Sequence, residues 1–172
     1  MMQSSSIRLR AVEPEDLDFM YLIENDTLLW KYGVSNVPFS RFALRNFIEQ
    51  TTNNLSRDGQ LRLTIEHSSG FPIGFIDLEN YDAVHNRAEV GIVVSPEWQN
   101  QGVASDALSL LMQYASDILH VHLLYAYVCR DNKPALRLFG NAGFMDSGVL
   151  PQWIRLASAY SDVIVFTKVL AD

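Results

Sequence analysis

The stretch VVSPEWQNQGVASDA, residues 93–107, carries the chain from an apolar strand through a short polar loop into a helix. Pro96 interrupts the strand, and the small residues Gly102 and Ala104 let a ligand approach the backbone just before the helix. Free N–H groups at the start of a helix can bind one anion together. The spacing Gln-x-x-Gly-x-Ala differs from the glycine patterns of dinucleotide folds and nucleotide P-loops. By itself the stretch suits either a phosphate-binding loop or an ordinary connection between strand and helix.

Length and composition predict one globular domain spanning residues 1–172. Hydrophobic residues make up 48% of the chain and charged residues 19%, which is typical of a globular fold. The formal net charge is −7, whereas nucleic-acid recognition needs a basic face. We therefore expect no nucleic-acid partner and favour a neutral or cationic one.

The sequence shows no targeting or membrane segment. Its start, MMQSSSIRLR, lacks the apolar core of a signal peptide, and no apolar run approaches the roughly 18 residues of a membrane helix. The single cysteine, Cys129, ends the apolar run LLYAYVC and excludes an internal disulfide. We expect a cytoplasmic protein without a membrane anchor, in which Cys129 is a buried structural thiol.

The first half of the chain predicts one strand, two helices and three more strands. Residues 7–10 alternate apolar and basic side chains as a half-buried strand does, and Glu13-Pro14-Glu15-Asp16 has the composition of a helix start. Residues 25–40 are irregular and could form one wall of a substrate site. A second helix is expected at 41–55, and an antiparallel meander at 61–67, 71–80 and 87–94.

The second half predicts a helix, a strand, a short helix and two closing strands. Apolar residues recur at helical spacing from Val103 to Ile118, the clearest such stripe in the chain. A strand at 123–128 precedes a helix at 133–142, which has Pro134 in its first turn and is ended by Gly143. The closing strands are expected at 149–156 and 163–170. The order β-α-α-β-β-β-α-β-α-β-β indicates an α/β fold with a mixed sheet.

This order of motifs resembles the GCN5-related N-acetyltransferase (GNAT) superfamily along nearly the whole chain. The family's pyrophosphate loop reads Gln/Arg-x-x-Gly-x-Gly/Ala, as residues 99–104 do here. Asn132-Lys-Pro-Ala135 with Gly143-Phe144 resembles the family's second cofactor motif. Within the superfamily, the stretch from Gly74 through Gly102 is similar to bacterial spermidine N-acetyltransferases and ribosomal-protein N-terminal acetyltransferases.

The resemblance implies a mostly antiparallel mixed sheet, flanked by helices, whose parallel fourth and fifth strands splay apart around acetyl-coenzyme A. The pantetheine arm would lie along Ile92, Val93 and Val94. The pyrophosphate would accept hydrogen bonds from the amides of Gln99, Asn100, Gln101, Gly102, Val103, Ala104 and Ser105. Asn132, Ala135 and Phe139 would contact the arm from the other side. Asn132 is also a good helix N-cap in its own right.

The implied reaction is direct attack of a primary amine on the thioester carbonyl. Such an amine has a pKa of about 10.4, so deprotonating it at neutral pH costs about 4 kcal/mol. A nearby carboxylate can bind the cation and relay its proton. Glu89 matches the family's strand glutamate and Asp77 an acidic position of the spermidine enzymes, so both are our catalytic candidates. The alternatives are a salt bridge between Glu89 and Arg87, and an exposed edge position for Asp77.

Phe139 departs from the family pattern. Many members place a tyrosine there, four residues before the Gly-Phe pair, and its hydroxyl can protonate the leaving thiolate. Without it, water, Tyr127 or Tyr160 would have to donate the proton. The helical spacing of Phe139 with Ala135 and Ala142 favours a packing role. A non-catalytic protein that senses acetyl-coenzyme A is therefore the rival hypothesis.

The acceptor is the least defined part of the reaction. The spermidine enzymes carry acids in the loop after the first helix, but residues 33–37 have none. Glu24, Asp26 and the net charge of −7 favour a polycation. We expect a polyamine, with a peptide N-terminal amine as the alternative, and leave homo-oligomerisation open. His120 and His122 have no third ligand nearby, so we expect no metal site.

Overall fold

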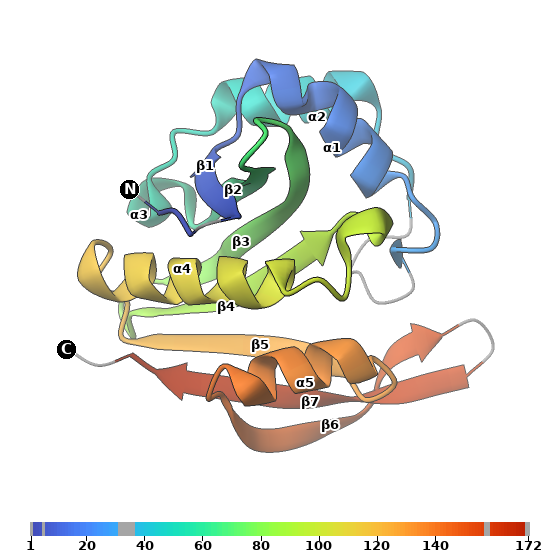
Figure 1. Cartoon of the computed structure of the whole chain (residues 1–172). Helices are drawn as coiled ribbons and strands as arrows, with labels where there is room; N and C mark the ends of the chain where they lie inside the picture. Colours follow the sequence, from blue (N-terminus) through green and yellow to red (C-terminus); the bar gives the residue numbers. More distant parts are fainter. Residues whose placement is uncertain (1, 5, 31–36, 157–158, 171–172) are drawn as a thin grey trace.

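The structure, a computed structural model, describes residues 2–4, 6–30, 37–156 and 159–170. One seven-stranded sheet runs through it in the order β1-β2-β3-β4-β5-β7-β6 (Figure 1). The strands are β1 (Ile7–Ala11), β2 (Leu61–His67), β3 (Pro72–Asp82), β4 (Arg87–Val94), β5 (Leu123–Cys129), β6 (Met145–Leu156) and β7 (Ala159–Val169). Only β4 and β5 pair in parallel, and the other neighbours are antiparallel. The mixed, mostly antiparallel sheet expected from the sequence is confirmed.

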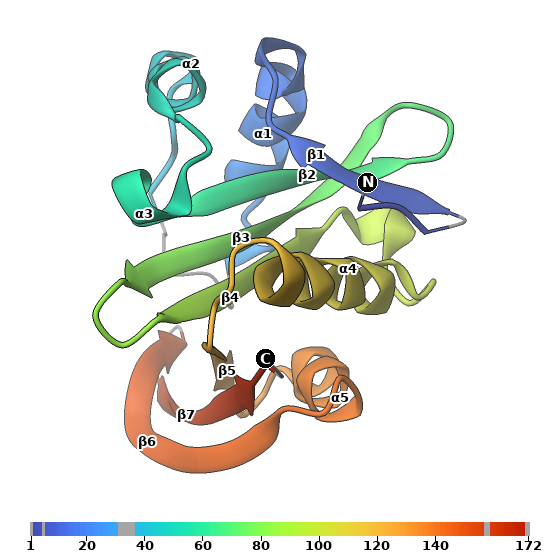
Figure 2. The ribbon, with the colours of Figure 1, turned by 90° about the vertical axis from the view of Figure 1, so that its left-hand side faces the viewer.

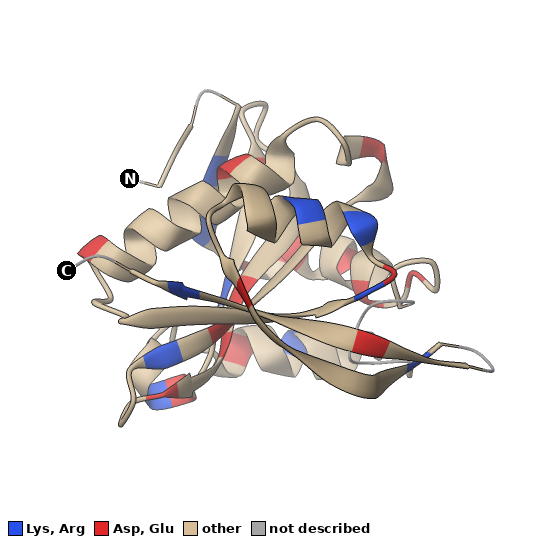
Figure 3. Ribbon diagram, turned by 90° about the horizontal axis from the view of Figure 1, so that it is seen from below, with Lys and Arg blue, Asp and Glu red and all other residues tan. Residues whose placement is uncertain are grey.

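Helices cover both faces of this sheet. They are α1 (Leu17–Glu24), α2 (Arg41–Gln50), α3 (Leu55–Asp58), α4 (Val103–Asp117) and α5 (Lys133–Asn141), with 3-10 turns η1 (Pro14–Asp16) and η3 (Pro96–Trp98). Figure 2 shows α1 and α2 above the first strands and α4 on the opposite side of them. Lys and Arg positions are scattered among Asp and Glu positions along the ribbon (Figure 3). No helix in the described ranges is long and apolar enough to cross a membrane.

The alternation of side chains along β4 separates the two faces. Ala88, Val90 and Val94 join the larger core, which also contains the buried side of α4. Val93 packs instead in a second cluster with Phe75 and the buried residues of α1 and α2. Because successive strand residues point to opposite faces, Glu89 and Gly91 share the α1–α2 face with Val93. The site described below lies on that face.

Several predicted boundaries were wrong. The helix expected at 41–55 ends at Gln50, and a separate α3 begins after Asn54, whose side chain accepts the amide of Arg57. Local capping by Asn54 therefore divides a stretch whose pattern predicts one helix. β6 and β7 begin earlier than expected, at Met145 and Ala159, because hairpin pairing extends strands that the local sequence marks weakly. Residues 31–36 and 157–158, within the predicted substrate loop and the closing connection, lie outside the described residues.

Asp16 ties the start of α1 to the sheet. Its carboxylate accepts hydrogen bonds from Nη1 and Nη2 of Arg10 at 2.7 and 2.8 Å, from the amide of Glu13 and from the hydroxyl of Thr64. Burial opposes ionisation of Asp16, but these bonds outweigh it and hold the pKa of the carboxyl below its usual value. The charged form of Asp16 therefore favours the folded state.

Asp16→Asn is expected to destabilise the protein by about 1–3 kcal/mol at pH 7, because charge-assisted hydrogen bonds are lost. A carboxyl with a lowered folded pKa stabilises the protein above its unfolded pKa of about 3.9 and loses that contribution below it. Urea unfolding of both proteins between pH 7 and pH 2 should therefore show the difference shrinking below about pH 4. A difference that stays constant across this range would contradict the role of the ionised carboxylate.

Candidate active site

β4 and β5 pair over only three residues and then diverge. The pairs are Arg87 with Leu123, Ala88 with Leu124 and Glu89 with Tyr125. Beyond Glu89, β4 continues alongside β3, while β5 continues alongside β7 to Cys129. Figure 1 shows the two ribbons separating in this direction. The backbone edge of β4 from Val90 to Val94 is thus not paired with β5, and the splayed parallel strands expected from the sequence are present.

The three residues proposed to hold the pantetheine arm lie on this unpaired part of β4. Ile92, Val93 and Val94 pair with Ile76, Phe75 and Gly74 of β3, which fixes their backbone from one side. Nε2 of Gln99 donates to the carbonyl of Val94 at 2.8 Å. The end of β4 is therefore held on the β3 side and by the following loop.

The loop after β4 leaves the start of α4 without a side-chain cap. Gly102 is the N-cap, with a φ of 84°, and makes no capping hydrogen bond through a side chain. Asn100 also has a positive φ, of 59°, and Nε2 of Gln101 donates to the carbonyl of Glu97 at 2.7 Å. The first amides of a helix have no partner within it, so those of Val103, Ala104 and Ser105 suit an anion.

Across the sheet, the residues of the second motif have structural roles. Oδ1 of Asn132 accepts the amide of Ala135 at 3.2 Å, so Asn132 caps α5. Phe139 is buried, and its ring centroid lies 5.1 Å from that of Phe144 and 6.0 Å from that of Phe166. The packing role expected for Phe139 is confirmed. Cys129 is a buried free thiol, also as expected.

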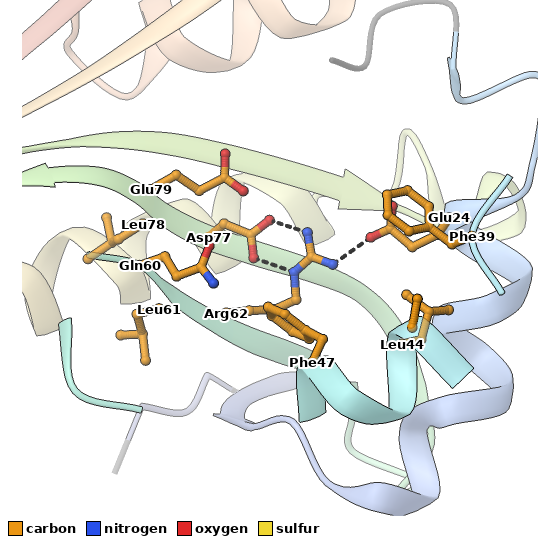
Figure 4. Close-up of a pocket in the computed structure, with 11 residues that line it drawn as sticks. Glu24, Phe39, Leu44, Phe47, Gln60, Leu61, Arg62, Asp77, Leu78 and Glu79 are labelled. Carbon is orange, nitrogen blue, oxygen red and sulfur yellow. Dashed lines mark hydrogen bonds and ion pairs between the residues drawn. The ribbon is translucent and has the colours of Figure 1, made fainter. Parts of the chain in front are cut away.

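Asp77 lies in the interior of the sheet, so the alternative of an exposed edge position is wrong. It is 6% exposed and accepts hydrogen bonds from Nε and Nη2 of Arg62 at 2.8 and 3.0 Å. Arg62 also pairs with Glu24 of α1 (Figure 4), and its guanidinium lies over the rings of Phe47 and Phe75. Burial raises the pKa of the Asp77 carboxyl although Arg62 pulls it down.

Glu89 faces a second carboxylate that sequence reasoning missed. Glu79 of β3 stands directly opposite Glu89 on the same face of the sheet. Burial and the charge of Asp77 raise the pKa of Glu79. Oε2 of Glu89 accepts from Nδ2 of Asn80 at 2.9 Å, whereas Arg87 pairs with Asp82, so the proposed salt bridge between Arg87 and Glu89 was wrong. The two-residue spacing of Asp77 and Glu79 was the signal that could have identified Glu79.

A cavity of about 270 Å³ opens between α2 and the strands β2 and β3. Figure 4 shows its lining, which combines aromatic rings with carboxylates and a guanidinium. The residues that give it this character are Glu24, Phe39, Phe47, Arg62, Asp77 and Glu79. Such a lining suits a chain that has both apolar carbons and cationic amines.

Comparison with known proteins agrees with this geometry. Residues 6–145 match the family described as Acetyltransferase (GNAT) domain. The chain is 28% identical over 161 residues to spermidine N(1)-acetyltransferase of Vibrio cholerae, covering 93% of this chain and 91% of the relative. It is 27% identical over 164 residues to the Escherichia coli K12 enzyme of the same name, covering 95% and 86%.

Solved structures give the same answer. The crystal structure of spermidine N-acetyltransferase from Vibrio cholerae in complex with CoA and spermine superposes with a TM-score of 0.89, at 25% identity and 97% coverage of both chains. A dodecameric structure of that enzyme in an intermediate state superposes with a TM-score of 0.83, at 25% identity, covering 97% of this chain and 95% of that one. The chain therefore belongs to the GNAT family of acetyl-coenzyme A-dependent N-acetyltransferases.

Proposed function

We propose that this protein acetylates a primary amine of a polyamine in the cytoplasm. The observation that carries the proposal is the cavity between α2 and the strands β2 and β3, where the described lining residues include three carboxylates, Glu24, Asp77 and Glu79, and one cation, Arg62. An excess of carboxylates in a partly buried site attracts a multiply charged amine. The spermidine N-acetyltransferase names of the relatives support the same class of acceptor.

The residues at the end of β4 and the start of α4 fit acetyl-coenzyme A as the second substrate. The unpaired edge of β4 at Ile92–Val94 offers backbone groups to the amides of the pantetheine arm. The uncapped start of α4 offers N–H groups to the pyrophosphate, and Gly102 leaves the backbone open to it. Because the arm would lie between β4 and β5, the thioester would come close to the level of Glu89 and Gly91.

The carboxylates can prepare the amine for attack. The acceptor arrives as an ammonium ion, which Glu79 and Glu89 attract from neighbouring strands. Asp77 is already bound to Arg62, so it is less available as a proton acceptor. A carboxyl with a raised pKa accepts a proton more readily, and Glu79 has this property. We assign proton acceptance, directly or through water, to the pair formed by Glu89 and Glu79.

Glu89→Gln is expected to lower kcat on the order of 10²-fold, because general-base catalysis is lost, while the Kd for acetyl-coenzyme A stays unchanged. Steady-state kinetics and titration calorimetry measure the two quantities. Glu79→Gln is the matched comparison, since it removes the opposite carboxylate of the same cross-strand pair. Wild-type kcat in Glu89→Gln together with a loss in Glu79→Gln would assign the role to Glu79 alone.

The activity itself is tested by release of free coenzyme A from acetyl-coenzyme A with a panel of acceptors. The panel contains spermidine and spermine, free amino acids, and peptides with a free N-terminus. Turnover with the polyamines is the expected result, and turnover only with peptides would favour the N-terminal alternative. Binding of acetyl-coenzyme A by calorimetry without thiol release for any acceptor would support the non-catalytic rival.

We also propose that residues 1–172 act as one domain and that several copies assemble. The support is the dodecameric form of the similar Vibrio cholerae enzyme. Light scattering of the purified protein measures its mass directly against the 19.5 kDa of one chain. A mass equal to that of a single chain at micromolar concentration would contradict assembly.

A further inference from the structure

Tyr127 lies on β5 just past the point where the strands separate. The last β4–β5 pair joins Glu89 to Tyr125, and Tyr127 comes two residues later on the same face of β5. The ring centroids of Tyr125 and Tyr127 lie 5.6 Å apart in an edge-on contact, which agrees with this shared face. Tyr127 is 45% exposed, so much of its ring is uncovered.

The residue of β4 at the same level is a glycine. In parallel strands, the position two residues beyond Glu89 corresponds to the position two residues beyond Tyr125, so Gly91 is the counterpart of Tyr127 across the gap. On its other side Gly91 pairs with Asp77 of β3. A Cβ atom at position 91 would lie 3.5 Å from Oδ2 of Asp77. Position 91 of β4 therefore places no side chain between the carboxylate of Asp77 and the gap next to Tyr127.

The other residues near the site are less suitable as proton donors to a thiolate in the gap between β4 and β5. Phe139 has no proton to give, and it is enclosed between Phe144 and Phe166. Tyr160 pairs with Arg155 in the β6–β7 hairpin. The last residue of β5, Cys129, pairs with Val163, so Tyr160 lies beyond the end of β5. Of the two tyrosines suggested by the sequence, only Tyr127 stands beside the diverging part of β4.

We propose that Tyr127 is the catalytic residue that protonates the leaving thiolate, in place of the tyrosine that Phe139 replaces. The inference rests on the acetyl transfer proposed above. The amine nitrogen bonds to the acetyl carbon, the carbon–sulfur bond breaks, and its electron pair leaves on sulfur. The phenol proton of Tyr127 passes to that sulfur, and the proton lost by the amine passes to the carboxylates on β3 and β4.

This arrangement places the acid and the base on opposite sides of the reacting thioester. The carboxylates that accept the proton lie on β3 and β4, and the hydroxyl that donates one lies on β5. The divergence of β4 and β5 therefore keeps the two groups apart. The exposure of Tyr127 lets the phenolate regain a proton from water after each turnover. Because Gly91 has no side chain, the acceptor can enter the space between the carboxylates and Tyr127.

The decisive variant is Tyr127→Phe, which keeps the ring and its contact with Tyr125 while removing the hydroxyl. We expect kcat for spermidine acetylation to fall on the order of 10- to 100-fold, the range of a lost general acid. The Kd for acetyl-coenzyme A and the melting temperature should stay at their wild-type values. Tyr160→Phe is the matched control, because it removes the hydroxyl of the other candidate donor, and it should keep the wild-type kcat.

Four measurements separate the outcomes. Turnover by the wild-type enzyme with any acceptor establishes the acetyl transfer, and its absence would overturn the proposed function itself. If the wild type is active and Tyr127→Phe has an equal kcat, the assignment of Tyr127 is wrong. A loss in Tyr160→Phe with none in Tyr127→Phe would move the donor to Tyr160. A fall in acetyl-coenzyme A affinity equal to the fall in kcat would show that Tyr127 only helps to bind the cofactor.

Discussion

Gly74→Ala is expected to lower the free energy of unfolding by about 3 kcal/mol or more, because overpacking against rigid backbone forces strands to move. A Cβ atom at position 74 would lie 2.4 Å from the carbonyl oxygen of Val93 and 3.2 Å from Cα of Val94. These are backbone atoms of the neighbouring strand, so no side-chain rotation relieves the clash. Typical domains are stable by only about 5–15 kcal/mol, which makes such a loss severe.

The same substitution should weaken acetyl-coenzyme A binding, since Val93 and Val94 are the residues proposed to hold the pantetheine arm. Urea unfolding and titration calorimetry measure the two effects. Gly140→Ala is the matched control: Gly140 lies in α5 with nothing within 4 Å of an added Cβ. There alanine should stabilise the protein by about 0.5–1 kcal/mol through helix propensity. Equal unfolding midpoints for Gly74→Ala and the wild type would show that β3 and β4 are not this close.

Arg62→Met is expected to destabilise the protein by about 3–5 kcal/mol at pH 7, the cost of leaving a buried charge without its partner. Arg62 is the cation that pairs with both Asp77 and Glu24, and methionine keeps only part of its contact with Phe47 and Phe75. Asp77 is 6% exposed, so its carboxylate has little contact with solvent to offset the loss of the guanidinium. Chemical unfolding at pH 7 measures the loss.

The pH dependence of this variant follows from Asp77. Burial already raises the pKa of its carboxyl in the folded protein, and loss of Arg62 raises it further. A group with a raised folded pKa favours folding at low pH and loses that contribution as the pH rises through the folded pKa. The deficit of Arg62→Met should therefore be smaller at pH 5 than at pH 8.

A double variant supplies the control for Arg62→Met. Adding Asp77→Asn removes the uncompensated charge, so Arg62→Met/Asp77→Asn should recover a large part of the lost stability. A double variant no more stable than the single one would show that Arg62 acts through packing on the aromatic rings. A deficit independent of pH would lead to the same conclusion.

Local patterns in the sequence were sufficient to predict the turn between β4 and α4 and the features of α5. The turn from β4 into α4 was predictable because Pro96, Gly102 and the apolar stripe of the helix act within a few residues of one another. The capping by Asn132 and the burial of Phe139 were predictable for the same reason. The resemblance to a known family then supplied the splay of β4 and β5.

Interactions between distant segments were not predictable in this way. The ion pairs of Arg62 join β2 to β3 and to α1, and the register between β2 and β3 places Arg62 opposite Asp77. Glu79 was missed because its importance comes from facing Glu89 across a strand pair. Arg87 could reach either Asp82 or Glu89 from sequence alone, and the turn between β3 and β4 decides for Asp82.

The three residue pairs between β4 and β5 also determine how the two halves of the sheet are connected. Strands β1 to β4 form one half of the sheet and β5, β7 and β6 the other, and the hydrogen bonding between the halves is confined to one end of the seam. An extended substrate lying in the open part of the seam would bridge the halves as an extra strand does. During each catalytic cycle the bound substrate would thus extend the hydrogen bonding across the seam. After release of the product, the halves would share backbone hydrogen bonds only at that end, while the common hydrophobic core keeps them packed together.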